Sequence, residues 1–292
     1  MYLSLILLLI TAFATRPSGP PQEVQVEHDV VYSIAEGYWS HTREDASRIP
    51  LLIKAGGRTR ELELKMDIYS PESDSSDARR PLLLMMHGGA FFFGNKEELG
   101  QSEWCRYFAS AGYVAASIDY RMGFRLKKED VSTAELRAEE DAVSALKYLL
   151  GREDLHIDPD RIFTAGTSAG GTTALAVAYK QDDIHIRAVA NLWGYVRDLT
   201  LLERASIPII SFQSESDPVV PFREGYPMNA KNLSDKVYGT ASIHERALEL
   251  GIPSEHHPCK EKRHRLHLDN WGRVNARYYE IRDSLASFFE KQ

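Results

Sequence analysis

Continuous apolar runs, separated by stretches with helical patterning, constrain the fold of this chain more than any other feature of its sequence. The runs are PLLLMM (81–86), YVAASIDY (113–120), RIFTAG (161–166), IRAVANLWG (186–194) and IPIISFQSES (207–216). Strands that are buried on both faces have this character, whereas a strand with one solvated face alternates apolar and polar residues. Buried strands that alternate with helices indicate a mostly parallel sheet covered by helices on both faces. We therefore predict an α/β protein.

The intervals between these runs and the two ends of the chain complete the predicted domain. Helical patterns lie at about 101–111, 132–152, 169–180, 237–250 and 270–289. Near the N-terminus, 23–34 and 59–71 alternate apolar and polar residues, which predicts half-exposed strands at an antiparallel edge of the sheet. No linker, repeat or change of composition interrupts the pattern, so we predict a single domain over residues 23–292.

The first residues predict a targeting segment. An apolar run extends from Leu3 to Ala14 and ends in Ala12-Phe13-Ala14, a small-x-small cleavage pattern. The run is too short to cross a bilayer, which needs about 20 apolar residues. We expect a signal peptide over residues 1–14 and an exported protein, secreted or periplasmic, without stable membrane insertion after cleavage. No Lys or Arg precedes the run, so an uncleaved anchor is the alternative.

Charge and cysteine content exclude several classes of protein. The net charge is −7, and the only dense basic run is KEKRHR at 260–265, which argues against nucleic-acid binding. Two cysteines, Cys105 and Cys259, are too few for a disulfide framework in a domain of this size. They either pair or remain thiols. Asn232 starts an N-glycosylation acceptor pattern, which matters only in a eukaryotic secretory pathway.

Ser168 stands on a predicted turn between a strand and a helix, in the sequence GTSAGG. Gly166 and Gly170 flank it. A sharp turn between a strand and a helix leaves no room for Cβ atoms beside a nucleophile, so glycine is expected at both positions. The turn lifts the hydroxyl above the end of the sheet, at a helix N-terminus that stabilises negative charge. The alternative is that Ser168 only caps the helix, because serine is a preferred N-cap residue.

The sequence HGGAF follows another buried strand and favours the nucleophile. Bare glycines after His87 allow backbone N–H groups to approach a bound oxyanion closely, and acyl transfer needs such donors for its tetrahedral intermediate. We assign this oxyanion hole to the N–H groups of Gly88, Gly89 and Ala169. A simple tight turn is the alternative.

Taken in order, the motifs HGGAFFFG, SIDYR, IDPDRIFTAGTSAGG and SESDPVVP resemble the esterase/lipase family of α/β-hydrolases, near its hormone-sensitive-lipase-like and bacterial carboxylesterase branches. The similarity runs from about residue 64 to the C-terminus. This chain departs from the family pattern at Ala90, where many members have a third glycine, and it contains no large lid segment. The resemblance implies an α/β-hydrolase fold, ester hydrolysis, and catalytic residues in the order serine, acid, histidine.

The resemblance implies an acid after the next-but-one strand following Ser168. Asp217 stands there, just past IPIISFQSES and before Pro218. A buried carboxylate at this position would orient the histidine and stabilise the imidazolium that forms during attack. Glu215 is the nearest competitor and Asp235 a distant one.

The histidine should follow the last strand, which we place near GIPSEHHPC (251–259). The family pattern puts His264 in the catalytic position, with His267 as the second choice. His256 and His257 are expected on the strand itself. The sequence contains no clean zinc spacing, so we expect neither a metal nor a cofactor.

Three further groups of residues are expected near the site or in the core beside it. Tyr120 and Arg121 match the family's DYR pattern and are expected to brace the oxyanion loop, whereas Asp141 is expected to be structural. Phe91–Phe93 and Trp193 lie at predicted strand ends, where they form either an acyl-binding wall or part of the core.

The spacing of strands bears on the substrate. About a dozen residues separate the predicted strands at 187–193 and 207–213, where this fold usually inserts its lid, so we expect a small lid or none and an open cleft. We therefore expect hydrolysis of short acyl esters, either small molecules or esters borne on a polymer such as a polysaccharide. A serine peptidase, an acyltransferase and a non-catalytic binding module on the same fold remain alternatives. The oligomeric state is not indicated.

Overall fold

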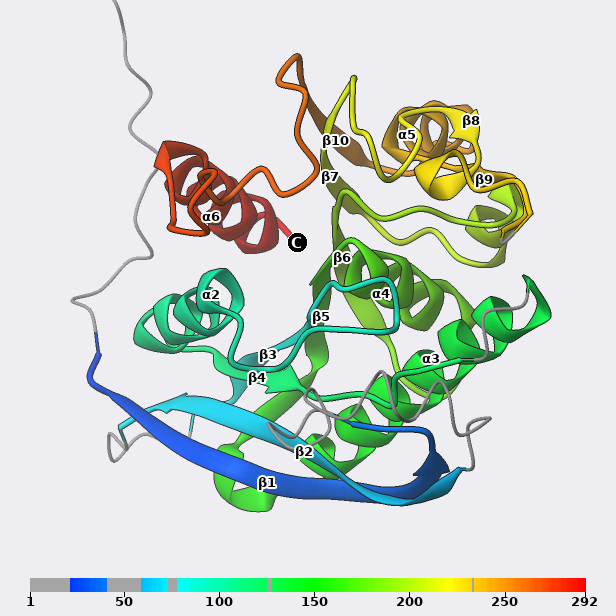
Figure 1. The fold of residues 1–292 in the computed structure, drawn as a ribbon. Helices are drawn as coiled ribbons and strands as arrows, with labels where there is room; N and C mark the ends of the chain where they lie inside the picture. The colour runs from blue at the N-terminus through cyan, green and yellow to red at the C-terminus, as the bar shows by residue number, and fades with distance from the viewer. Residues whose placement is uncertain (1–21, 41–58, 73–77, 125–127, 233) are drawn as a thin grey trace, which may run out of the picture.

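An eight-stranded sheet forms the centre of the computed structural model, which describes residues 22–40, 59–72, 78–124, 128–232 and 234–292. The strand order is β1-β2-β4-β3-β5-β6-β7-β10 (Figure 1). Strand β2 is antiparallel to β1 and to β4, and every pair from β4 to β10 is parallel. The predicted α/β class, with a mostly parallel sheet and an antiparallel N-terminal edge, is therefore confirmed.

The strands of the sheet are β1 (Val24–Gly37), β2 (Arg60–Pro71), β3 (Arg80–Met86), β4 (Val114–Ile118), β5 (Ile157–Thr167), β6 (Ile186–Leu192), β7 (Ile209–Ser214) and β10 (Ser254–Cys259). A separate ribbon pairs β8 (Glu224–Gly225) with β9 (Val237–Tyr238). The α-helices are α2 (Leu99–Ser110), α3 (Lys128–Leu150), α4 (Ala169–Lys180), α5 (Thr240–Glu249) and α6 (Ala276–Glu290). The short 3₁₀ helices are η1 (Glu153–Leu155), η2 (Leu199–Arg204) and η3 (Pro227–Asn229).

Helices cover the sheet on both faces, with α2 and α6 on one face and α3 and α4 on the other (Figure 1). Strand β3 shows how the apolar run divides between them. Leu82 and Leu84 pack in the core under α3 and α4, whereas Leu83 and Met85 pack under α2 and α6. Side chains alternate along a strand, so a continuous apolar run supplies both cores.

Helix α6 begins at Ala276, later than the pattern from about 270 predicts. The side chain of Asn275 caps it by accepting a hydrogen bond from the Tyr278 N–H at 3.2 Å. The preceding residues form a loop closed by a bridge between Leu268 and Val274. An Asn cap satisfies a free helical N–H group and fixes the start of the helix.

Several sequence expectations have plain structural outcomes. The predicted signal peptide at 1–14 lies outside the described residues, and no helix among those described is long and apolar enough to cross a membrane. Cys105 is buried, Cys259 is half-buried, and neither forms a disulfide. Asn232 is exposed.

A buried ion network joins the first two strands to the loop that follows β3. Lys96 is only 3% exposed, and its Nζ lies 2.8 Å from Oδ1 of Asp67 and 3.2 Å from Oδ1 of Asp29. The Lys96 N–H also donates to Oδ1 of Asp119 at 2.7 Å. Burial alone would raise the pKa of Asp67, but the hydrogen bonds from Lys96, the Asp29 N–H and His28 together lower it below the ordinary value.

We predict that Lys96→Met lowers the free energy of unfolding by about 3–5 kcal/mol, because it removes the ammonium group that pairs with the buried Asp67 carboxylate. Urea denaturation measures this loss. Lys65→Met is the matched control, since Lys65 is 36% exposed and lies 3.7 Å from Glu63. A surface pair contributes about 1 kcal/mol or less. Equal losses in the two variants would contradict the prediction.

His267 is buried in the core between Trp104 and Trp193. It is 1% exposed, and the ring centroids lie 5.4 Å from Trp104 and 5.3 Å from Trp193. Burial lowers the pKa of His267 to about 3, and the nearby charge of Arg265 acts in the same direction. The imidazole is therefore neutral wherever the protein is folded at ordinary pH.

We predict that His267→Leu makes the protein less sensitive to acid. The folded-state pKa lies below the unfolded value, so the wild type loses stability as the pH falls from about 6.5 toward 3. Between pH 7 and pH 5 this loss amounts to about 2 kcal/mol, and the variant should escape it. Urea denaturation at the two pH values tests the difference, and substitution of the exposed His185 serves as the control. The same loss in wild type and His267→Leu would refute the prediction.

Candidate functional site

The parallel strands end level with one another, so the loops that follow them open at one edge of the sheet. Met86 pairs with Gly166, Leu192 pairs with Phe212, and Ser214 pairs with Cys259. The predicted oxyanion loop, nucleophile, acid and base all follow these strand ends. Ligands bind at this carboxyl edge in open α/β sheets.

Ser168 occupies a sharp turn between β5 and α4. Its backbone lies at φ 53° and ψ −116°, and its N–H donates to the Leu192 carbonyl at 2.8 Å. Close approach requires glycine beside it, since a Cβ on Gly170 would lie 2.0 Å from the Met86 carbonyl oxygen. The Ser168 side chain makes no capping hydrogen bond. The N-cap interpretation therefore does not account for this serine.

His264 connects Ser168 to Asp217. The Ser168 hydroxyl lies 2.8 Å from His264 Nε2, and His264 Nδ1 lies 2.8 Å from Oδ2 and 3.0 Å from Oδ1 of Asp217. The Asp217 side chain is fully buried, and its Oδ1 accepts hydrogen bonds from the N–H groups of Val219 and Val220. This arrangement can transfer a proton from the serine hydroxyl to an imidazole that a carboxylate orients.

The competing acids and histidines lie elsewhere. Glu215 is exposed, and Asp235 pairs with Arg197 at 3.7 Å. His256 and His257 lie on β10, where His256 Nε2 contacts the Thr240 hydroxyl at 3.0 Å. His267 is buried in the core. Across the described ranges, no cluster of three His, Cys, Asp or Glu side chains is arranged to hold a metal ion.

The expected oxyanion loop borders the serine. A Cβ on Gly88 would lie 3.3 Å from the Ser168 Cβ, and Ala169 is the first residue of α4. Gly89 adopts φ 113°, a conformation that glycine adopts readily and other residues do not. Ala90, the departure from the family pattern, follows at φ 54°. The structure thus brings Gly88 and Ala169 close to the nucleophile, and Gly89 is the next residue of the same loop.

Two side chains hold this loop from outside. The Tyr120 hydroxyl donates to the His87 carbonyl at 2.8 Å, and the two rings stack with centroids 4.2 Å apart. Tyr120 thus braces the loop, whereas Arg121 pairs with Asp141 through its Nε at 2.8 Å. Glu98 is the second side chain beside this loop, where the Gly88 N–H acts to lower the pKa of its carboxyl.

Glu98 could not be identified from the sequence, because an acidic residue just before a helix is common. Burial raises its pKa, while the charge of Arg265 and the Gly88 N–H act in the opposite direction.

The apolar residues near the site divide between core and surface. Phe91, Phe92 and Trp193 are buried, whereas Phe93 is 58% exposed. Of the four aromatic residues proposed as an acyl-binding wall or as core, three are core and only Phe93 is open to solvent.

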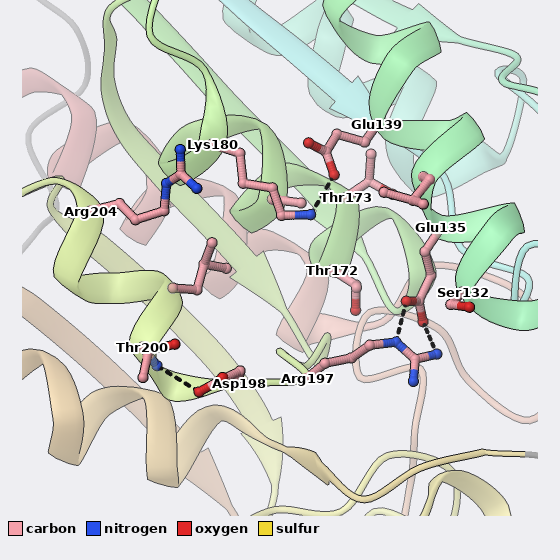
Figure 2. A pocket seen from close by; sticks show the side chains of 13 residues that line it. Ser132, Glu135, Glu139, Thr172, Thr173, Lys180, Arg197, Asp198, Thr200 and Arg204 are labelled. Atoms are coloured by element: carbon pink, nitrogen blue, oxygen red, sulfur yellow. Dashed lines mark hydrogen bonds and ion pairs between the residues drawn. The ribbon is translucent and has the colours of Figure 1, made fainter. Parts of the chain in front are cut away.

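A separate pocket of about 540 Å³ lies between α3, α4 and η2 (Figure 2). Its charged side chains face one another across the pocket. Lys180 lies 2.6 Å from Glu139, and Arg197 pairs with Glu135. Ser168, Asp217 and His264 do not line it. Its charges are thus largely neutralised by one another, and it is distinct from the cluster around Ser168.

Comparisons with known proteins agree with this architecture. Residues 66–193 match the family model described as BD-FAE. Arylacetamide deacetylase of Bos taurus is 26% identical over 220 residues, which cover 72% of this chain and 49% of that protein. The non-reducing polyketide synthase ausA of Emericella nidulans is 32% identical over 127 residues, or 40% of this chain and 5% of that protein. The chain thus spans about half, or much less, of the length of these relatives.

The fold has solved counterparts among bacterial esterases. A structure of esterase 2 from Thermogutta terrifontis, phosphoramylated by tabun, superposes with a TM-score of 0.58. Sequence identity is 23%, and the match covers 78% of this chain and 89% of that one. The expected fold and resemblance are confirmed. The chain therefore has an α/β-hydrolase fold and is similar in sequence and in fold to esterases.

Proposed function

We propose that this protein hydrolyses carboxylic esters through a covalent acyl-enzyme formed on Ser168. The observation that carries the proposal is the chain of 2.8 Å contacts from the Ser168 hydroxyl through His264 to Asp217. A serine becomes nucleophilic when an adjacent base accepts its proton and a third group orients that base. A serine that only capped a helix would not need this pair of partners.

The proposed cycle has two halves. The Ser168 Oγ attacks the ester carbonyl carbon while its proton passes to His264 Nε2, and the alcohol leaves with that proton as the acyl-enzyme forms. Water then attacks the acyl-enzyme and gives a proton to His264, and the carboxylic acid leaves as the serine regains its hydrogen. The buried Asp217 carboxylate stabilises the imidazolium in both halves.

Backbone N–H groups would stabilise the tetrahedral intermediates of both halves. Gly88 and Ala169 border the serine, and Gly89 follows Gly88 in the same loop. Each such donor lowers the barrier by about 3 kcal/mol when it meets the developing oxyanion.

The comparisons support ester chemistry. Arylacetamide deacetylase removes acetyl groups from amides by its name, and esterase 2 of T. terrifontis has solved structures phosphorylated by paraoxon and bound to propionate or butyrate. On this basis we propose that the substrates of this chain also carry short acyl groups. The connection from β6 to β7, residues 193–208, contains only the short helix η2, which favours an open cleft.

The natural ester is proposed to be a short acyl ester on a small molecule or on a polymer. We also propose that the protein is exported, because an apolar run extends from Leu3 to Ala14. The assignment of Ser168 as the nucleophile depends on neither proposal.

We predict that Ser168→Ala abolishes hydrolysis of p-nitrophenyl acetate, with kcat reduced by about 10⁴-fold or more. Asp217→Asn should lower kcat by about 10⁴-fold, because the histidine loses its orientation and tautomer. Paraoxon should add one phosphoryl group to the wild type and none to Ser168→Ala, as measured by intact-protein mass spectrometry. Ser144→Ala, on the outer side of α3, is the control. Undiminished hydrolysis by Ser168→Ala would exclude the proposed nucleophile.

We predict that kcat/KM falls along a series of p-nitrophenyl esters from acetate and butyrate to octanoate and palmitate, because the cleft has no extended apolar cover in the β6–β7 connection. Initial rates below the solubility limit of each ester test this order, with Ser168→Ala supplying the background. Activity that rises toward palmitate would rule out short acyl esters as the substrate class.

A further inference from the structure

The three segments that carry Ser168, Asp217 and His264 meet at residues 192 and 193. The Leu192 carbonyl accepts the Ser168 N–H at 2.8 Å, and the Trp193 N–H donates to the Phe212 carbonyl on β7 at 2.8 Å. Strand β7 leads directly to Asp217. The Trp193 ring completes the set, because it lies against His264 with an interplanar angle of 70° and a centroid distance of 6.5 Å.

The backbone of Trp193 is strained. Its φ is 51°, in the left-handed region, where a bulky aromatic residue is an outlier. Such strain persists only where the surroundings hold it, and it concentrates at functional sites. Here the next residue is also held, because the Gly194 N–H donates to Oδ1 of Asn191 at 2.8 Å. The strained turn directs a fully buried indole toward the histidine.

Trp193 is the fourth ring in a buried column that ends at the triad histidine. Successive rings lie 5.2, 5.4, 5.3 and 6.5 Å apart between centroids. The rings, in order, are Tyr278, Trp104, His267, Trp193 and His264. The column joins α6 and α2 to the loop that carries His264 and to the end of β6, so it connects the imidazole to two packed helices.

His267 is the small ring in the middle of this column and the anchor of the loop. A Cβ on Gly100 would lie 2.3 Å from His267 Cδ2, so α2 approaches the imidazole as closely as its backbone allows. The Nδ1 atom of His267 is buried and has no hydrogen-bond partner among the residues that the structure describes. Polar bonding at that atom therefore does not hold the ring, and packing between Trp104 and Trp193 does.

We propose that Trp193 and His267 are positioning residues for His264. The polar contacts to Ser168 and Asp217 fix the two nitrogen atoms of His264, and the Trp193 ring limits tilting of the imidazole about the line between them. His267 holds Trp193 and anchors the loop three residues beyond His264. This inference rests on the proposed function, since it assigns the residues that set the geometry of its base.

Trp193→Leu tests the proposal. A misplaced base slows both chemical steps, so kcat for p-nitrophenyl acetate should fall about 10- to 100-fold. Trp193 is buried and does not line the cleft surface, so KM should change less than about threefold. Trp193→Phe keeps an aromatic ring and should recover most of kcat. The rate of phosphorylation by paraoxon should follow kcat across the series.

His267→Leu provides the second arm, because it removes the ring that supports Trp193. It should also lower kcat with little change in KM, and the double variant should lose about as much as Trp193→Leu alone, since both changes act through one ring. Phe108→Leu is the matched control. Phe108 lies in the same core cluster, so this variant should lose stability and keep kcat.

Several outcomes would overturn the proposal. They are an unchanged kcat in Trp193→Leu, a change confined to KM or to acyl-length preference, and independent, additive effects of the two substitutions. If Trp193→Leu does not fold, His267→Leu decides the question, because an unchanged kcat in that variant would then contradict a positioning role. Failure of the proposed function is distinguishable, since it would appear as full activity in Ser168→Ala.

Discussion

The parallel register of the central strands is the constraint on which the rest of the structure depends. Because β3, β5, β6, β7 and β10 end at the same level, segments more than 170 residues apart, from His87 to His264, reach one edge of the sheet. Hydrogen bonds between strands fix this register, since a slip by one residue would turn each side chain to the opposite face. The contacts among Ser168, His264 and Asp217 are therefore a consequence of sheet formation.

Two other devices act on the loops that the sheet positions. The loop after β3 is held from outside by Tyr120 and by the buried network around Lys96. The loop after β10 has little regular structure, and it is fixed by buried side chains, with His267 among them. Hydrogen bonds act on this second loop as well, since Arg263 donates to the Leu268 carbonyl and the Asn275 amide to the Leu266 carbonyl.

Much of this architecture could be predicted from the sequence, but the contacts beneath the site could not. Apolar runs identify strands because burial on both faces requires them, and motifs at strand ends identify Ser168, Asp217 and His264 because parallel strands deliver their ends to one edge. Glu98 and the role of Trp193 could not be predicted in this way. Each depends on which distant backbone faces the side chain, and neither residue type signals that contact locally. The predicted start of α6 was too early for a related reason. Asn275 acts as a cap only in its folded surroundings.

The distribution of the four tryptophans gives the protein an internal optical reporter. Trp39, Trp104 and Trp193 are at most 2% exposed, whereas Trp271 is 84% exposed. Indole emission moves to longer wavelength when water reaches the ring, so unfolding shifts the fluorescence of three rings while the fourth supplies a nearly constant background. Because two of the three buried rings flank His267, the same signal follows the order of the packing beneath the proposed catalytic base.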